Sequence, residues 1–297
     1  MSVAWALLST AAINDRVLPS LAASDQIRVV AVASRDPAKV RAYAAERGIE
    51  RAHGSYDALL ADPQVEAVYV NLPNSLHTEW TLRALEAGKH VLCEKPMTPR
   101  AADVERVFDL ARRRDLYVME GFMYRHNPQT LKLVQLVNEG VVGAVKLVRS
   151  SFRFRAIDPQ DIRLSPALEG GSLMDVGAYC VNITRLLAGE PTRLYGEEVV
   201  GPSGVDVRFS GILRFADDVI GQFDAAVSLP ARAEIEIFGE EGSLFVKDPW
   251  LCGHPGIEIR RDDTAEHIGI ACQASRECDS RPEGEEKPGQ QEENQLH

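Results

Sequence analysis

Short apolar runs alternate with helix-like stretches over the first 121 residues of the chain. The apolar runs span residues 3–8, 27–33, 65–72, 90–93 and 117–120, and most of their residues are apolar, which is typical of strands buried on both faces. Helical patterns lie between them, at about residues 14–23 and at 36–47, 56–60, 78–87 and 101–114. This order of elements predicts an α/β fold, a doubly wound parallel sheet with helices on both faces.

The pattern changes after about residue 122. One helix is expected at 128–139 and another at 173–188. The remaining segments have the period of strands, at 144–154, 192–200, 207–215, 219–229, 233–239 and 242–247. Because one helix lies among these strands and the five strands from residue 192 onward follow one another without an intervening helix, we expect an α+β domain with a large, mostly antiparallel, open-faced sheet.

These patterns divide the chain into three parts, residues 1–121, 122–270 and 271–297. The last part carries seven acidic and three basic residues with almost no large apolar side chains. Such a segment cannot bury enough surface to offset its loss of conformational entropy. We therefore expect a disordered polar tail.

The strands of the second domain also suggest an oligomer. Apolar residues alternate at Val219, Gly221, Phe223 and Ala225, so one face of the sheet should pack on helices. We expect the open face to be apolar too, and a soluble monomer rarely exposes such a surface. The expectation is a homodimer or higher homo-oligomer built on this sheet.

Composition limits the possible partners and cofactors. The net charge is −11, from 33 basic and 44 acidic residues, which disfavours nucleic acid and anionic membranes as partners. No apolar run reaches the length needed to span a bilayer. The five cysteines match no metal-ligand spacing and are odd in number, so we expect reduced thiols, no metal and a cytoplasmic protein.

The turn after the first strand is a candidate phosphate-binding loop. In a doubly wound sheet a dinucleotide pyrophosphate lies here, against the start of the first helix. The usual glycines would fall at Ser9, Ala11 and Asn14, and all three are missing. Small side chains still allow a close approach, and Ser9 and Thr10 add hydroxyl groups. An ordinary strand–helix turn remains an equally open interpretation.

The end of the second strand bears on the choice between NAD and NADP. An acidic residue there would bind the ribose 2′-hydroxyl of NAD. This chain has Ser34 and Arg35 instead, with Lys39 one turn later. A hydroxyl and two cations suit the 2′-phosphate of NADP, so NADP is expected and NAD stays possible. The alternative is a solvated helix start.

Two further segments, residues 71–77 and 94–96, follow the third and fourth apolar runs. Open α/β sheets bind ligands at the carboxyl ends of their strands. Lys95 in such a crevice could donate to a carbonyl or alkoxide oxygen, or relay a proton. The alternative for a single lysine is a surface charge.

Four segments together resemble a known family. They are residues 89–96 (KHVLCEKP), 71–77 (NLPNSLH), 119–129 (MEGFMYRHNPQ) and 170–179 (GGSLMDVGAY). They are similar to the motifs of the glucose–fructose oxidoreductase / inositol dehydrogenase (Gfo/Idh/MocA) family, and the resemblance runs from about residue 3 to about residue 265. At position 179 the chain has tyrosine, where many members have histidine. In this respect the chain looks closest to the branch of dihydrodiol dehydrogenases and NADP-dependent D-xylose dehydrogenases.

The resemblance implies an N-terminal Rossmann domain and a catalytic role for Lys95, Asp175 and Tyr179. Asp175 and Tyr179 are four residues apart, so they would share one face of a helix and line the substrate cleft opposite Lys95. In this branch the lysine and the tyrosine manage the proton of the substrate hydroxyl while nicotinamide takes the hydride. Without the resemblance, Asp175 could be a charge near a helix N-terminus and Tyr179 a core aromatic residue.

The same resemblance implies two sets of binding residues. The cofactor would be bound by Ser9, Thr10, Ala11, Ala12, Ile13, Ser34, Arg35, Lys39, Leu72, Pro73, Asn74, His77, Glu94, Lys95 and Arg125. The substrate, a sugar, cyclic polyol or diol, would be bound by Lys95, Met123, Phe152, Arg153, Asp175 and Tyr179. For His77 a structural role is equally open.

Two functions therefore stand against each other. The first is an NADP-dependent dehydrogenase or reductase acting on CH–OH groups, which the presence of Lys95, Asp175 and Tyr179 favours. The second is a non-catalytic member that binds a dinucleotide as a sensor or regulatory partner. A departure from the family pattern bears on both, because the polar tail replaces the helical segment that usually follows the last strand. A nonfunctional truncated product is the third possibility.

Overall fold

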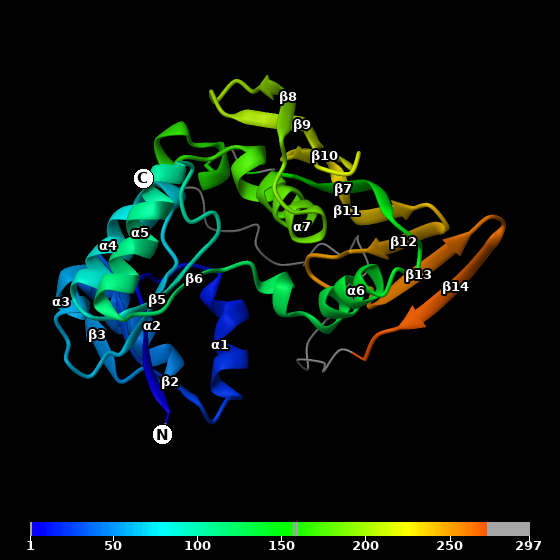
Figure 1. The fold of residues 1–297 in the computed structure, drawn as a ribbon. Helices are drawn as coiled ribbons and strands as arrows, with labels where there is room; N and C mark the ends of the chain where they lie inside the picture. The colour runs from blue at the N-terminus through cyan, green and yellow to red at the C-terminus, as the bar shows by residue number, and fades with distance from the viewer. Residues whose placement is uncertain (1, 157, 159, 272–297) are drawn as a thin grey trace, which may run out of the picture.

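The computed structural model describes residues 2–156, 158 and 160–271, which form two lobes (Figure 1). The first lobe holds a six-stranded sheet and the second an eight-stranded sheet. The α/β fold class expected from the sequence is confirmed. Among the described residues no helix is long and apolar enough to cross a membrane. The predicted tail, apart from Ala271, lies outside the described residues.

The first sheet is parallel throughout, in the order β3-β2-β1-β4-β5-β6. Its strands are β1 (Val3–Leu7), β2 (Ile27–Ala33), β3 (Arg51–His53), β4 (Ala67–Val70), β5 (His90–Cys93) and β6 (Val118–Glu120). Ala6, Val32 and Val68 are fully buried, as expected for strands covered on both faces. The edge strand β3 was not predicted, because its three residues form no apolar run.

Five helices cover this sheet. They are α1 (Asn14–Ala22), α2 (Pro37–Arg47), α3 (Tyr56–Leu60), α4 (Asn74–Glu86) and α5 (Ala101–Arg114). The α2 helix begins where the Asp36 carboxylate accepts hydrogen bonds from the backbone N–H groups of Ala38 and Lys39, at 2.9 and 3.0 Å. The α4 helix begins at Asn74 and not, as predicted, at residue 78. The prediction started too late because the mainly polar first turn after Pro73 has the composition of a loop.

The second lobe contains a mostly antiparallel sheet in the order β14-β13-β12-β11-β7-β10-β9-β8. Its strands are β7 (Val145–Arg155), β8 (Arg193–Val200), β9 (Asp206–Arg214), β10 (Ile220–Ala226), β11 (Ser228–Gly239), β12 (Gly242–Lys247), β13 (Gly256–Arg261) and β14 (Thr264–Gly269). Only β7 and β10 pair in parallel. The β13–β14 hairpin was not predicted, because β14 is almost wholly exposed and carries few apolar residues.

The helices η1 (Met123–His126), α6 (Pro128–Asn138) and α7 (Ala178–Ala188) accompany this sheet. Phe223 and Ala225, on the face that packs against the core, are buried. The alternate residues of β10, Gln222 and Asp224, point to the open face, where Arg149 and Glu234 of the neighbouring strands also lie. The expectation of an apolar open face was therefore wrong at its centre, because the strand period assigns the apolar set to one face only.

The helix expected at 173–188 begins as a single π-helical turn, η4 (Leu173–Gly177). Asp206 of β9 fixes its start: the carboxylate accepts hydrogen bonds from Ser172 Oγ at 2.6 Å and from the Leu173 N–H at 2.7 Å. Gly177 lets the turn lie close to β10, since a Cβ there would be 3.2 Å from that of Ala225. A wide turn of this kind changes the direction of the side chains that it carries.

We predict that Asp206→Ala lowers the free energy of unfolding by about 1–2 kcal/mol, because two donors at the start of η4 lose their acceptor. Urea denaturation measures the difference. Asp263→Ala, in the exposed turn between β13 and β14, is the matched control and should change stability by under about 0.5 kcal/mol. Equal stability of the two variants would contradict the capping role.

Candidate active site

A cavity of about 510 Å³ lies at the carboxyl ends of β1, β2, β4 and β5, between the two lobes. It brings together fourteen of the fifteen residues expected to bind a cofactor. They are Ser9, Thr10, Ala11, Ala12, Ile13, Ser34, Arg35, Lys39, Leu72, Pro73, Asn74, His77, Glu94 and Lys95. The exception is Arg125, which is exposed in η1 and does not line the cavity.

The loop before α1 forms one end of the cavity. Ser9 Oγ donates a hydrogen bond to the Asn71 carbonyl at 2.9 Å and accepts one from the Ala11 N–H at 3.1 Å, so this hydroxyl holds the loop in place. The backbone N–H groups of Thr10, Ala12 and Ile13 have no hydrogen-bond partner among the described residues. Unpaired N–H groups at a helix start form an anion site, so the loop fits a pyrophosphate without its glycines.

The end of β2 forms the outer part of the same cavity. The nearest carboxylate, Asp36, is engaged by two N–H groups of α2, which lower its pKa. Lys39 also lowers the pKa of Asp36 through its charge. Arg35, Lys39 and the Ser34 hydroxyl all line this end of the cavity, a donor set that fits a phosphate rather than a ribose diol.

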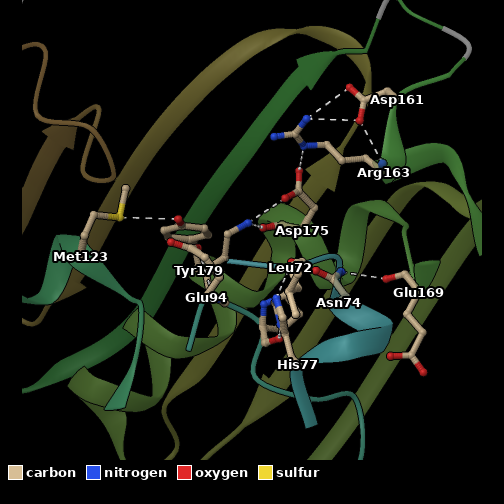
Figure 2. Close-up of polar contacts among 12 residues, drawn as sticks. Leu72, Asn74, His77, Glu94, Met123, Asp161, Arg163, Glu169, Asp175 and Tyr179 are labelled. Carbon is tan, nitrogen blue, oxygen red and sulfur yellow. Dashed lines mark hydrogen bonds and ion pairs between the residues drawn. The ribbon is translucent and has the colours of Figure 1, made fainter. Parts of the chain in front are cut away.

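The other end of the cavity holds an ion cluster around the Asp175 carboxylate, whose side chain is 12% exposed, whereas that of Arg163 is 43% exposed. Lys95 Nζ donates hydrogen bonds to the Asp175 carbonyl and to Asp175 Oδ1, each at 2.7 Å. Arg163 Nε donates to Asp175 Oδ2 at 2.9 Å. Figure 2 shows the Arg163 guanidinium directed at this carboxylate. Burial raises the pKa of Asp175, but the charges and hydrogen bonds of Lys95 and Arg163 outweigh it, so the pKa lies below its usual value and the carboxylate is ionised at neutral pH.

Tyr179 lies beside this cluster but is not hydrogen-bonded to it. The Lys95 ammonium is 5.2 Å from the centre of the Tyr179 ring, a cation–π distance. The hydroxyl points away, toward Met123 Sδ at 3.6 Å (Figure 2). Burial, helped by the charges of Glu94 and Asp175, raises the pKa of Tyr179, so the phenol stays protonated and can donate.

Two family models match the chain. Residues 5–122 match an oxidoreductase family with an NAD-binding Rossmann fold, and residues 130–245 match the GFO/IDH/MocA C-terminal domain. A D-xylose 1-dehydrogenase (NADP(+)) of Haloferax volcanii is 41% identical over 243 residues, which cover 81% of this chain and 74% of the relative.

The chain belongs to the Gfo/Idh/MocA family of oxidoreductases.

Other members extend the likeness. The human trans-1,2-dihydrobenzene-1,2-diol dehydrogenase is 31% identical over 261 residues, 85% of this chain and 76% of the relative. A 3-ketoreductase from Actinomadura kijaniata, crystallised with NADP and TDP-benzene, superposes with a TM-score of 0.83 at 33% identity, covering 92% of this chain and 85% of that one. The family and the branch expected from the sequence are confirmed.

The residues expected to bind substrate are only partly brought together in this family member. Phe152 and Met123 both contact Tyr179, with a ring distance of 5.3 Å for Phe152. Arg153 is a correction: it lies on the open face of the sheet, 3.5 Å from the Asp224 carboxylate. Neighbouring residues of a strand point to opposite faces, so Phe152 and Arg153 cannot both face the site.

His77 has the surroundings of a structural residue. It is buried in the first turn of α4, with Nδ1 2.7 Å from the Pro96 carbonyl and Nε2 2.7 Å from the Leu72 carbonyl. Burial lowers its pKa more than the two carbonyls raise it. The ring thereby ties the loop after β4 to the loop after β5, although one edge still reaches the cavity.

Sequence reasoning missed several residues of this site. Arg163, Ile162 and Leu168 line the cavity from the irregular connection between β7 and η4, where no periodic signal exists. Tyr69 donates a short hydrogen bond to Glu94 from inside a strand predicted only as core. Among the described residues no cluster of histidine, cysteine and acidic side chains could hold a metal ion.

Proposed function

We propose that this protein is an NADP-dependent oxidoreductase that transfers a hydride between the cofactor and a hydroxyl- or carbonyl-bearing carbon of a sugar, cyclic polyol or diol. The observation that carries this function is the Lys95 ammonium, which Asp175 holds in a cavity that also contains an anion-binding loop. The relatives named above act on the same classes of compound.

The chain would hold NADP at three places. The N–H groups of residues 10, 12 and 13 suit the pyrophosphate, and Arg35 with Lys39 suits the 2′-phosphate. When bound, NADP supplies the hydride donor or acceptor. The chain's own side chains would transfer the proton and stabilise the charge that develops on the substrate oxygen.

Lys95 and Tyr179 divide that work. The Lys95 ammonium polarises the substrate oxygen and stabilises the negative charge that develops on it. The protonated Tyr179 hydroxyl would donate the proton when a carbonyl is reduced, which leaves a phenolate. In the oxidation direction Tyr179 must first lose its own proton to solvent, and the phenolate then receives the proton of the alcohol. Asp175 stays ionised and keeps the ammonium in place.

An aromatic cluster surrounds Tyr179 beside the cavity. Phe152 stacks on the buried Trp250 with ring centres 5.6 Å apart, and the buried Phe122 packs edge-on against Tyr179 at 5.3 Å. Phe152 is the partly exposed ring of this cluster, and it would pack on the C–H face of a sugar or cyclic diol while Lys95 and Asp175 meet its hydroxyl groups.

A non-catalytic sensor is the rival function. A sensor would need the anion-binding loop but not an ion pair at the opposite end of the cavity. NADPH oxidation and NADP reduction across a panel of sugars and diols distinguish the two. Turnover with at least one member supports the enzyme, and cofactor binding without any turnover would favour the sensor.

We predict that NADPH binds more tightly than NADH, and that Arg35→Ala weakens NADPH about 10- to 100-fold because a charge-assisted bond to the 2′-phosphate is lost. Fluorescence titration measures both cofactors. NADH affinity should not change in Arg35→Ala, and the exposed Arg41→Ala on α2 should leave both affinities as they are. Tighter binding of NADH by the unaltered protein would contradict this assignment.

Lys95→Met should lower turnover by about 10²–10⁴-fold, because the ammonium is removed while the apolar stem is kept. NADPH affinity should stay nearly unchanged, whereas the thermal unfolding midpoint should fall, because the buried Asp175 carboxylate loses one of its two ion-pair partners. Lys132→Met, on helix α6 and away from the cavity, is the matched control. In Tyr179→Phe, turnover should fall as far as in Lys95→Met if the phenol transfers the proton. Turnover should fall less if the phenol only orients the substrate. Wild-type turnover in Lys95→Met would refute the role of Lys95.

We further propose that the open face of the second sheet forms a homodimer. Its centre carries three cations and three carboxylates, so a two-fold partner could match them in pairs. They are Arg149, Arg153, Arg232, Asp224, Glu234 and Glu236. We predict a dimer by light scattering at micromolar concentration, and a shift toward monomer in Arg232→Glu but not in Arg112→Glu on α5. A monomeric wild-type protein would rule this interface out.

A further inference from the structure

The connection between β7 and η4 forms the wall of the cavity that faces Lys95. It contains the short helices η2 (Ile162–Leu164) and η3 (Pro166–Leu168). Of its residues that line the cavity, Ile162, Leu168 and Gly170 are uncharged. This wall belongs to neither sheet, and Arg163 is the one charged residue among its described residues that line the cavity.

The Arg163 guanidinium is held from several directions. Its Nε donates to Asp175 Oδ2 at 2.9 Å, and its Nη1 lies 3.2 Å from both carboxylate oxygens of Asp161. The Asp161 carboxylate also accepts from the backbone N–H of Arg163 at 2.9 Å. The guanidinium lies 5.5 Å from the centre of the Phe154 ring. Charges therefore alternate along Asp161, Arg163, Asp175 and Lys95 (Figure 2).

The two oxygens of Asp175 have different partners. Oδ1 accepts from Lys95 and Oδ2 from Arg163. The carboxylate is thus fixed at both ends, and its side chain is only 12% exposed. If Arg163 were absent, Asp175 Oδ2 would lose its ion-pair partner, and because the Arg163 side chain is 43% exposed, water would replace only part of the lost stabilisation.

We propose that Arg163 is a positioning residue: it holds the Asp175 carboxylate in the orientation that presents Oδ1 to Lys95. The inference rests on the proposed function, since it concerns how the lysine of that reaction is kept in place. Arg163 acts through Asp175 and contributes no proton to the reaction.

Removal of Arg163 should lower turnover less than removal of Lys95. Lys95 retains its 2.7 Å bond to the Asp175 carbonyl whether or not the carboxylate moves. Removal of Arg163 therefore leaves the ammonium in the cavity but loosens one of its two anchors. The expected signature is a lower kcat with little change in the affinity for NADPH.

The pH dependence follows from the groups around Asp175. These are Lys95 from the loop after β5, Arg163 and Asp161 from the η2 segment, Tyr179 of α7, and Glu94 in the cavity. Two cations lower the pKa of Asp175, and with one of them gone its pKa must rise. Activity that needs the carboxylate is then lost at a higher pH when the solution is acidified.

In Arg163→Gln we expect kcat to fall about 10- to 100-fold and the acid limb of the kcat profile to move up by about one pH unit. Arg163→Lys should restore the acid limb, because the charge returns, and recover part of kcat. Arg112→Gln, an arginine paired with Asp109 on the exposed face of α5, is the matched control and should behave as wild type.

A second measurement does not depend on turnover. In protein labelled with ¹³C at aspartate carboxyl groups, the Asp175 resonance is identified as the one missing from Asp175→Asn. Its titration midpoint, measured without cofactor, should be about one pH unit higher in Arg163→Gln than in wild type. Should Arg163→Gln fail to fold, Arg163→Met replaces it, because it also removes the charge but keeps the apolar stem of the side chain, and it should give the same shift.

The outcomes separate the two proposals. An unchanged Asp175 midpoint together with a wild-type pH profile in Arg163→Gln would overturn the role of Arg163 and leave the enzyme assignment intact. A wild-type protein with no turnover on any substrate would overturn the proposed function, and the NMR titration would still report whether Arg163 controls Asp175.

Discussion

The contact between Lys95 and Asp175 is the interaction on which the rest of the site depends. It joins the loop after β5 in the parallel lobe to the turn η4 in the other lobe, through two bonds of 2.7 Å. A buried carboxylate is tolerated only where cations or donors satisfy its oxygens. The requirement that Asp175 be satisfied therefore holds the two lobes together at the cavity. Asn74, which donates to the Glu169 carbonyl at 2.8 Å, adds a second link.

The position of Asp175 depends in turn on the antiparallel sheet. Asp206, on β9, caps the start of η4, and Gly177 lets that turn approach β10. The sheet thus positions Asp175, but its described residues contribute no charged side chain to the cavity. Its core-facing side supplies Phe152 to the aromatic wall, and its other side presents the ionic surface that we assign to a partner subunit.

The two ends of the cavity are built in different ways. The cofactor end comes from short, local turns after β1 and β2, where a few consecutive residues expose N–H groups and cations. The opposite end, where we propose that the reaction occurs, is assembled from segments far apart in the chain, since Lys95 meets Asp175 across 80 residues of sequence. A change in packing between the lobes should therefore affect the reacting end more than the cofactor end.

The sequence by itself determined the parallel sheet, most of its helices and the candidate cofactor-binding turns after β1 and β2, because these rest on local patterns such as mostly apolar strands and the cations after β2. Family motifs added Lys95, Asp175 and Tyr179. Only the tertiary structure decided that Arg163 joins them, that Arg153 faces away and that the Tyr179 hydroxyl points toward Met123. Those outcomes depend on which face of a strand each side chain takes, on the π-helical turn η4 and on how the two lobes meet. The contacts that stabilise them join residues far apart in the chain, and such contacts produce no periodic pattern in the sequence.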